Sequence, residues 1–146
     1  MEKYHQEIMV EEYIRGKEIT ALMIDGKKQI VLAEERIFFK KEKYNLYGFE
    51  EAWSDEEFYD VKKYSLSPEI KKDIKRAFKV LEMRDYARIE IIIDHKGKHY
   101  FIDPNVNPAF GPIEAGEAFG YLINLYGIKF IDVAKQIIDN VHLRFK

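Results

Sequence analysis

Residues 86–103, with the sequence YARIEIIIDHKGKHYFID, carry the clearest architectural signal because two alternating apolar patterns flank a short turn there. The first pattern covers residues 86–93, the second covers residues 98–103, and a DHKG turn joins them. If Asp94 pairs with Gly97, the cross-strand partners are Arg88 with Asp103, Glu90 with Phe101, and Ile89 with Ile102. The isoleucines at odd positions then share one face, so we expect an antiparallel hairpin that packs this face on a core.

Charged side chains gather on the opposite face of the hairpin, where Arg88, Glu90 and Asp103 lie at one end. An ordinary pair between Arg88 and Asp103 would explain them, and such a pair contributes about 0.2–1 kcal/mol on an exposed sheet. A site for a hard cation would explain them too. Asp103 begins the rigid stretch DPNVNP, which also supplies Asn105, and carboxylate and amide oxygens suit Mg²⁺. The sequence leaves both interpretations open.

The first forty residues predict further β structure. We expect strands at residues 8–14, 18–24 and 29–33, with a tight turn at Arg15-Gly16. Asp25-Gly26 is a strong hairpin signal between the second and third of these strands. The regular spacing of the turns favours an antiparallel meander.

Helices are predicted on both sides of the 86–103 hairpin. Ser67 is a candidate N-cap, Pro68 fits the first helical position, and Glu69 complements the helix dipole. Two further helices are expected at residues 114–126 and from about residue 131 onward. Because strands and helices are segregated along the chain, we expect an α+β fold in which helices flank an antiparallel β-sheet.

Residues 40–65 carry charge clusters and scattered aromatic side chains without a regular period. A loop of this length inside a compact domain is uncommon and is often functional. A surface excursion pinned by its aromatic side chains is the other interpretation, and the sequence leaves both open.

Composition excludes several classes of protein. The 146 residues are 47% hydrophobic and 34% charged, with no cysteine and a net charge of −2. This length predicts a single domain over residues 1–146, and the lack of cysteine excludes disulfides and thiol catalysis. The net charge gives no reason to expect a nucleic-acid partner or an anionic membrane surface. No apolar run of about 18 residues and no basic leader occurs, so we expect a cytoplasmic protein.

Three segments together resemble the C-terminal half of the ATP-grasp domain in D-alanine–D-alanine ligases. Residues 10–20, VEEYIRGKEIT, resemble the segment that receives adenosine. Residues 58–64, FYDVKKY, resemble the ω-loop segment that closes over nucleotide and substrates. Residues 87–90, ARIE, followed by residues 103–108, DPNVNP, resemble the catalytic arginine and the metal-binding motif. The three segments occur in the family's order over nearly the whole chain, which makes the match specific to the superfamily.

The resemblance implies a nucleotide site. Its adenine contacts would come from one short segment, which comprises Glu11, Glu12, Tyr13 and Ile14, the last three through their backbone. Glu18 would bind the ribose hydroxyls, and Lys63 would belong to the lid over the phosphates.

The resemblance also implies the chemistry of the site, with ATP and Mg²⁺ as cofactors and a small amino-acid-like substrate in peptidoglycan biosynthesis. Glu90 and Asp103 would hold one Mg²⁺, and Asp103 and Asn105 would hold a second. A carboxylate would attack the γ-phosphate of ATP, and an amine would then take the resulting acyl phosphate. Arg88 would stabilise charge on the acyl-phosphate and tetrahedral intermediates.

The chain departs from the family after the metal-binding motif. Where the ligases usually carry Pro-Gly-Met-Thr and then serines, this chain has PAFGPI at residues 108–113, so the serines that would hold a D-alanine carboxylate are missing. Asp103 also replaces the commoner glutamate, and the lid segment is one residue shorter than usual. The identity of the substrate therefore stays open.

The domains that precede this region in the family are not found in these 146 residues. We expect either a piece of a longer ligase, inactive by itself, or a truncated relative that no longer catalyses. The second would work as a binding or dimerisation module, with a homodimer as one form.

Overall fold

The computed structural model describes residues 7–40, 43–45 and 58–145. Its five strands are β1 (Gly16–Ile24), β2 (Ile30–Phe38), β3 (Tyr59–Lys63), β4 (Tyr86–Asp94) and β5 (His99–Asn105). Its helices are α2 (Pro68–Val80), α3 (Ala118–Leu125) and α4 (Phe130–Arg144), with a short 3₁₀ turn η1 (Ile113–Ala115). All strand pairs are antiparallel in the order β3-β2-β1-β4-β5, which confirms the α+β fold.

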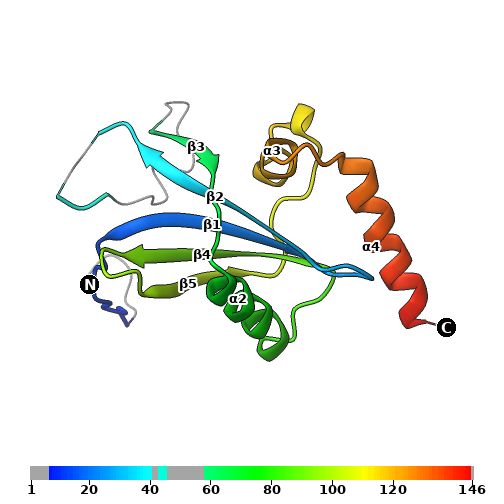
Figure 1. Ribbon diagram of the computed structural model, residues 1–146, viewed down its shortest axis with the longest axis horizontal. Helices are drawn as coiled ribbons and strands as arrows, with labels where there is room; N and C mark the ends of the chain where they lie inside the picture. The colour runs from blue at the N-terminus through cyan, green and yellow to red at the C-terminus, as the bar shows by residue number, and fades with distance from the viewer. Residues whose placement is uncertain (1–6, 41–42, 46–57, 146) are drawn as a thin grey trace.

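The sheet is covered on both faces, and alternate residues of β1 point to different cores. On one face, Ile19 and Met23 pack with the buried side of α2, which crosses in front of the sheet in Figure 1. On the other face, Leu22 and Ile24 pack with residues of α3 and α4, which gather toward one end of the sheet. Being central and covered twice, β1 is buried from Ile19 onward.

The start of α2 confirms the expected N-cap. The Ser67 side chain accepts a hydrogen bond of 3.2 Å from the Ile70 backbone N–H, and proline occupies the first turn. Ile70, Ile74 and Phe78 form the buried side of the helix. None of the helices in the described ranges is long and apolar enough to cross a membrane.

The 86–103 hairpin is confirmed, but its expected register is wrong. The backbone N–H of Asp94 donates to Lys98, not to Gly97, because Gly97 has a φ of 81° and adds one residue to the turn. The Asp94 carboxylate stabilises this turn by accepting from the N–H groups of Lys96 and Lys98. A bulge between Glu90 and Ile91 then shifts the register again, so that Glu90 lies opposite Asp103 and Arg88 opposite Asn105.

Two other expectations need correction. Residues 8–14 form no strand, and Gly16 begins β1 instead of closing a turn. The apolar side chains at the start of that segment, Ile8, Met9 and Val10, are 61%, 80% and 90% exposed, so they gain little packing from the part of the chain that the structure describes. Within residues 40–65, β3 pairs with β2, although neither face of its short sequence YDVKK is consistently apolar. Residues 41–42 and 46–57 of that segment lie outside the described residues.

The remaining elements agree with the sequence. The strands expected at residues 18–24 and 29–33 are found as β1 and β2, although β2 runs on to Phe38. The two C-terminal helices are found as α3 and α4, with α3 beginning only at Ala118.

Candidate functional site

The sheet face that α3 and α4 cover at one end becomes polar along the strands, and we call this part the polar face. It consists of Glu18 and Thr20 on β1, Glu34 and Arg36 on β2, Lys63 on β3, Arg88 and Glu90 on β4, and Asp103 and Asn105 on β5. Cross-strand pairing aligns one residue from each strand in a single row, which runs Lys63, Glu34, Thr20, Glu90, Asp103. The register therefore gathers charges from both edges of the sheet.

Glu90 is held by three neighbours on the polar face. Its Oε2 accepts a hydrogen bond of 2.8 Å from the Thr20 hydroxyl and lies 3.9 Å from a terminal nitrogen of Arg36. Its Oε1 lies 3.2 Å from Nε of Arg88, outside hydrogen-bond alignment. The ion pair expected between Arg88 and Asp103 is therefore replaced by one with Glu90, because the bulge moves Asp103 away from Arg88.

Arg36 joins two of the expected ligand residues. Its guanidinium donates to Oε2 of Glu18 at 3.0 Å, reaches toward Glu90, and lies 4.7 Å from the ring centre of Tyr59. Burial lowers the pKa of Arg36, but the neighbouring Glu90, Tyr59 and Glu18 more than compensate and leave it above its ordinary value. Burial raises the pKa of Glu18, against the opposing charge of Arg36.

Glu34 is a buried carboxyl with an unsatisfied oxygen. It is 8% exposed, and its Oε2 has no hydrogen-bond partner. Burial first, and then the charge of Glu90, raises the pKa of Glu34 to about 7, although Arg36 and Arg88 oppose the shift. An unsatisfied buried carboxyl oxygen is costly, so this position is stabilised by a proton or by an added cation.

Lys63 extends from the sheet edge toward the helices. Its ammonium lies 5.1 Å from the ring centre of Tyr126, the C-cap residue that follows α3. The Tyr126 hydroxyl in turn donates to the backbone carbonyl of Ala33, next to Glu34, at 2.6 Å. The lysine therefore lies on the polar face, as the pairing of β3 with β2 requires.

The expected adenine segment precedes β1 and is largely exposed. Glu11 and Glu12 are exposed, Ile14 is half-buried, and the Tyr13 ring packs edge-on against Tyr44 with centres 4.9 Å apart. The segment continues directly into Glu18, at the end of the polar face. The described contacts tie it to residues 44–45 and not to the nine residues of the polar face.

The polar face offers oxygen donors of the kind that Mg²⁺ prefers. Glu90 and Asp103 are direct cross-strand partners, Asn105 follows on the same face, and the unsatisfied oxygen of Glu34 lies one row position beyond Thr20. Over the described ranges, no group of three or more His, Cys, Asp or Glu side chains gathers closely enough to hold a metal. The carboxylates of Glu90 and Asp103 and the amide of Asn105 are the kinds of ligand that Mg²⁺ binds. Thr20 and the two arginines of the polar face hold Glu90 in place.

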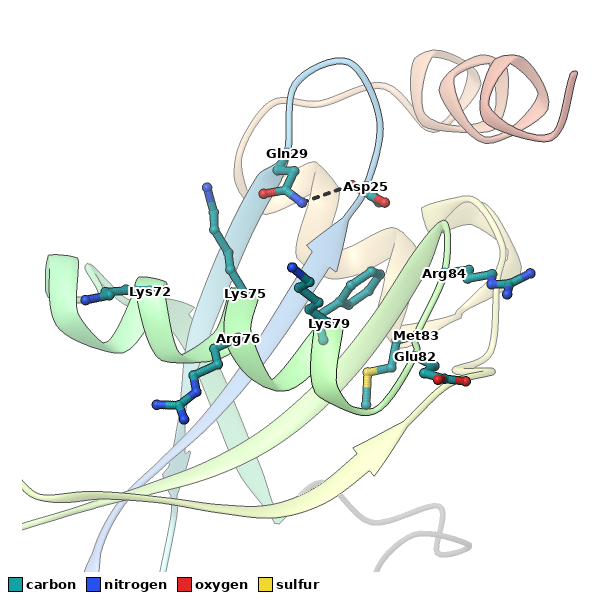
Figure 2. Close-up of a pocket in the computed structure, with 10 residues that line it drawn as sticks. Asp25, Gln29, Lys72, Lys75, Arg76, Lys79, Glu82, Met83 and Arg84 are labelled. Carbon is teal, nitrogen blue, oxygen red and sulfur yellow. Dashed lines mark hydrogen bonds between the residues drawn. The ribbon is translucent and has the colours of Figure 1, made fainter. Parts of the chain in front are cut away.

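The hollow drawn in Figure 2 lies elsewhere, on the α2 side of the sheet. It measures about 760 Å³ and is lined by basic side chains of α2 together with the Asp25–Gln29 pair and Arg84. In the figure Lys75 and Lys79 rise toward Gln29, whereas Lys72 and Arg76 extend away from it. The cations do not converge, and no residue of the polar face lines this hollow.

Three residues of the polar face were not predicted from the sequence: Thr20, Glu34 and Arg36. Because the third strand was expected to end at Ala33, Glu34 and Arg36 fell outside the predicted sheet. The available signal was the pair of opposite charges at positions 34 and 36, which align with Thr20 and Glu18 once the hairpin register is known.

Comparisons with known proteins agree on one family. The family model described as "D-ala D-ala ligase C-terminus" matches residues 1–139. D-alanine–D-alanine ligase B of Clostridium perfringens (strain 13 / Type A) is 30% identical over 137 residues, which cover 90% of this chain and 42% of that protein. D-alanine–D-alanine ligase A of the same strain is 35% identical over 94 residues, covering 62% of this chain and 29% of that protein.

Solved structures show the same fold. D-alanyl-alanine synthetase A from Vibrio cholerae has a TM-score of 0.63 at 20% identity, covering 87% of this chain and 39% of that chain. D-alanine–D-alanine ligase from Bacillus anthracis, complexed with ATP, has a TM-score of 0.61 at 22% identity, covering 92% and 42%. The chain thus spans less than half the length of these relatives.

Proposed function

This chain belongs to the D-ala D-ala ligase C-terminus family, and we propose that it forms the nucleotide- and Mg²⁺-binding subdomain of an ATP-dependent carboxylate–amine ligase. One observation carries the proposal. The strand register brings Glu18, Lys63, Arg88, Glu90, Asp103 and Asn105 onto one sheet face, although the sequence separates them widely. Family membership alone would not require these particular side chains to meet.

The nucleotide lies along the polar face in this proposal. Adenine contacts the exposed segment Glu11 to Ile14, and the ribose hydroxyls bind Glu18, which follows it at the start of β1. The phosphates then point toward the row that contains Lys63, Glu90 and Asp103. The order of these residues supports the arrangement, because a nucleotide presents base, sugar and phosphates in the same order.

Glu90, Asp103 and Asn105 would hold Mg²⁺, and the bound ion would neutralise charge on the phosphate oxygens. Lys63 places an ammonium beside the same phosphates from the edge strand. Arg88 provides a planar guanidinium for the oxyanion that develops at the reacting carboxyl group. Since phosphoryl transfer leaves little covalent work to the protein, positioning and charge neutralisation are what these side chains contribute.

The reaction proceeds in two steps. A substrate carboxylate attacks the γ-phosphorus and releases ADP, giving an acyl phosphate. An amine then attacks the acyl carbon, releases inorganic phosphate, and loses its proton to form the amide. The curated relatives are named as D-alanine–D-alanine ligases.

The substrate of this chain is a small amino-acid-like molecule of a kind that does not require serine hydroxyls. Phe110, in the segment that replaces those serines, packs in an aromatic cluster with ring centres 4.7 Å from both Phe119 and Phe130. That packing gives this part of the site an apolar boundary. The proposal includes a cytoplasmic location, because the enzyme needs a supply of ATP.

Calorimetry on this chain with Mg²⁺ and a non-hydrolysable ATP analogue tests the proposal. We expect binding that weakens at least tenfold when Glu90→Gln and Asp103→Asn are combined, since both changes remove charge from the donor set. Glu69→Gln, an exposed change on α2, is the control and should bind like the wild type. The proposal is wrong if the wild type binds no nucleotide, or if the double variant binds as well as the control.

A second candidate function is a non-catalytic dimerisation module, and the outer side of α4 favours it. Ile131, Ile138 and Phe145 are 55%, 66% and 86% exposed and recur with the heptad spacing of paired helices. Analytical ultracentrifugation of the wild type and of Ile138→Lys distinguishes the two. A dimer that the substitution dissociates supports this candidate, and a monomer at all concentrations rejects it.

A further inference from the structure

Arg36 bridges two residues that the proposed function assigns to different parts of one ligand. One terminal nitrogen lies 3.0 Å from Oε2 of Glu18, the expected ribose residue, and the other lies 3.9 Å from Oε2 of Glu90, an expected Mg²⁺ ligand. The guanidinium therefore marks the point on the polar face between the sugar and the metal-bound phosphates.

In any nucleoside triphosphate, the α-phosphate stands between the ribose and the β- and γ-phosphates that a metal ion binds. A ligand that places its ribose at Glu18 and its metal at Glu90 must carry the α-phosphate past the group between them. We propose that Arg36 binds the α-phosphate of the nucleotide, an inference that rests on the proposed function.

The local structure holds the guanidinium ready for this contact. The Arg36 side chain is 13% exposed, so most of it is fixed within the sheet face. The ring of Tyr59, 4.7 Å away, supports the guanidinium from β3. An arginine fixed in this way loses little conformational entropy when it binds, and its planar fork matches two phosphate oxygens.

Exchange of partners gives the contact its driving force. In the free protein, Arg36 is balanced by the carboxylates of Glu18 and Glu90. The ribose hydroxyls and the metal ion take up those carboxylates when the nucleotide binds. The α-phosphate then supplies the negative charge that Arg36 loses, so the guanidinium stays paired throughout.

The sharpest test compares adenosine with AMP, because the two differ only in the α-phosphate, and Mg²⁺ is present in both titrations to take up the Glu90 carboxylate. Both are titrated into the 146-residue chain and followed by NMR chemical shifts, which measure weak binding directly. The variants are Arg36→Gln and Arg36→Lys. The matched control is Arg76→Gln, which changes an exposed arginine on α2, on the other side of the sheet.

We expect Arg36→Gln to lower the affinity for AMP about 10- to 100-fold, the range for a charged hydrogen-bonded contact, and to leave adenosine within twofold. The AMP affinity of Arg36→Lys should lie between those of the wild type and Arg36→Gln, because lysine keeps the positive charge but lacks the planar guanidinium. Unchanged adenosine binding also shows that the variant is folded.

Three results would overturn the inference and leave the proposed function standing. An equal loss of affinity for adenosine and for AMP would show that Arg36 only supports the structure of the site. A gain in AMP affinity would make it an internal competitor for the site, and no change would leave it without a role. A wild type that binds neither ligand contradicts the proposed function itself, and this inference with it.

Discussion

At the scale of one residue, the buried carboxyl of Glu34 makes the stability of the folded protein depend on pH. Its pKa is raised to about 7 from an ordinary 4.5, so the folded protein holds the proton more tightly than the unfolded chain does. Stability is therefore fully present below pH 4.5 and is lost as the pH rises toward 7. A shift of this size corresponds to about 3 kcal/mol at most.

Glu34→Gln is expected to remove this loss. The variant should be more stable than the wild type by about 1–3 kcal/mol at pH 8 and should differ little at pH 4.5, because glutamine stays neutral at both. Urea unfolding at the two pH values measures the difference. An equal difference at both values would show that Glu34 is not the group that titrates.

Gly120 is a residue whose missing side chain makes room for the backbone. A Cβ at this position would lie 2.5 Å from the backbone nitrogen of Ile113 and from the carbonyl carbon of Pro112. Gly120→Ala would ordinarily stabilise a helix by up to about 1 kcal/mol. Here the rigid neighbour reverses the sign, and we expect a net loss of about 1–3 kcal/mol in thermal unfolding. A variant that is more stable than the wild type would contradict the close approach.

Among the elements, α4 is attached by apolar packing in its first half and by polar contacts at the end of the sheet. Gln136 and Asn140 donate to the backbone carbonyl of Asp25 at 2.7 and 2.8 Å, and Arg144 forms a paired contact with Asp85. Val133 is buried in the core, and Phe130 and Ile137 are partly buried against the same cluster. The polar contacts join the middle and the end of the helix to the turn between β1 and β2 and to Asp85, before β4.

Removing these amide contacts should loosen α4 selectively. We expect Gln136→Ala with Asn140→Ala to raise hydrogen exchange across α4 by about 10-fold or more, a loss of about 1–2 kcal/mol, while β1 and β4 stay protected. Asp139→Ala, an exposed change on the same helix, is the control. Exchange that rises equally in the sheet would show that α4 does not open by itself.

The elements also show how far the sequence leads. The N-cap of α2 and the β4–β5 hairpin were predictable because local chemistry specifies them: a serine before proline, and isoleucines at alternate positions. The register was not, because the left-handed Gly97 and the bulge near Glu90 each shift it, and neither changes the alternation of the sequence. The polar face could likewise be predicted from the sequence only in part. Arg88, Glu90 and Asp103 were correctly predicted to share one sheet face, although with other cross-strand partners, whereas Glu34 and Arg36 join them only through long-range pairing with β1.

At the scale of the whole molecule, a nucleotide bound as proposed would contact strands from one edge of the described sheet to the other. β3 and β5 are the two edges of the described sheet, and each has a strand partner on one side only. Lys63 lies on β3, and Asp103 and Asn105 lie on β5, so in the proposed arrangement a phosphate chain with its metal would reach both edges. In the same arrangement, adenosine would reach Glu18 on the central strand and neither edge.

Mg²⁺ with a non-hydrolysable ATP analogue should therefore protect the edges of the sheet, and adenosine should not. At 100 times its dissociation constant, a ligand stabilises the native state by about 2.7 kcal/mol, which slows exchange through global opening by about 100-fold. Hydrogen exchange measured by strand separates the two cases, because the triphosphate should slow β3 and β5 even where opening is local. With adenosine at the same saturation, those strands should exchange locally as fast as in the free protein. If both ligands protect the edges equally, the phosphates do not extend across the sheet, and the assignment of Lys63, Asp103 and Asn105 to them fails.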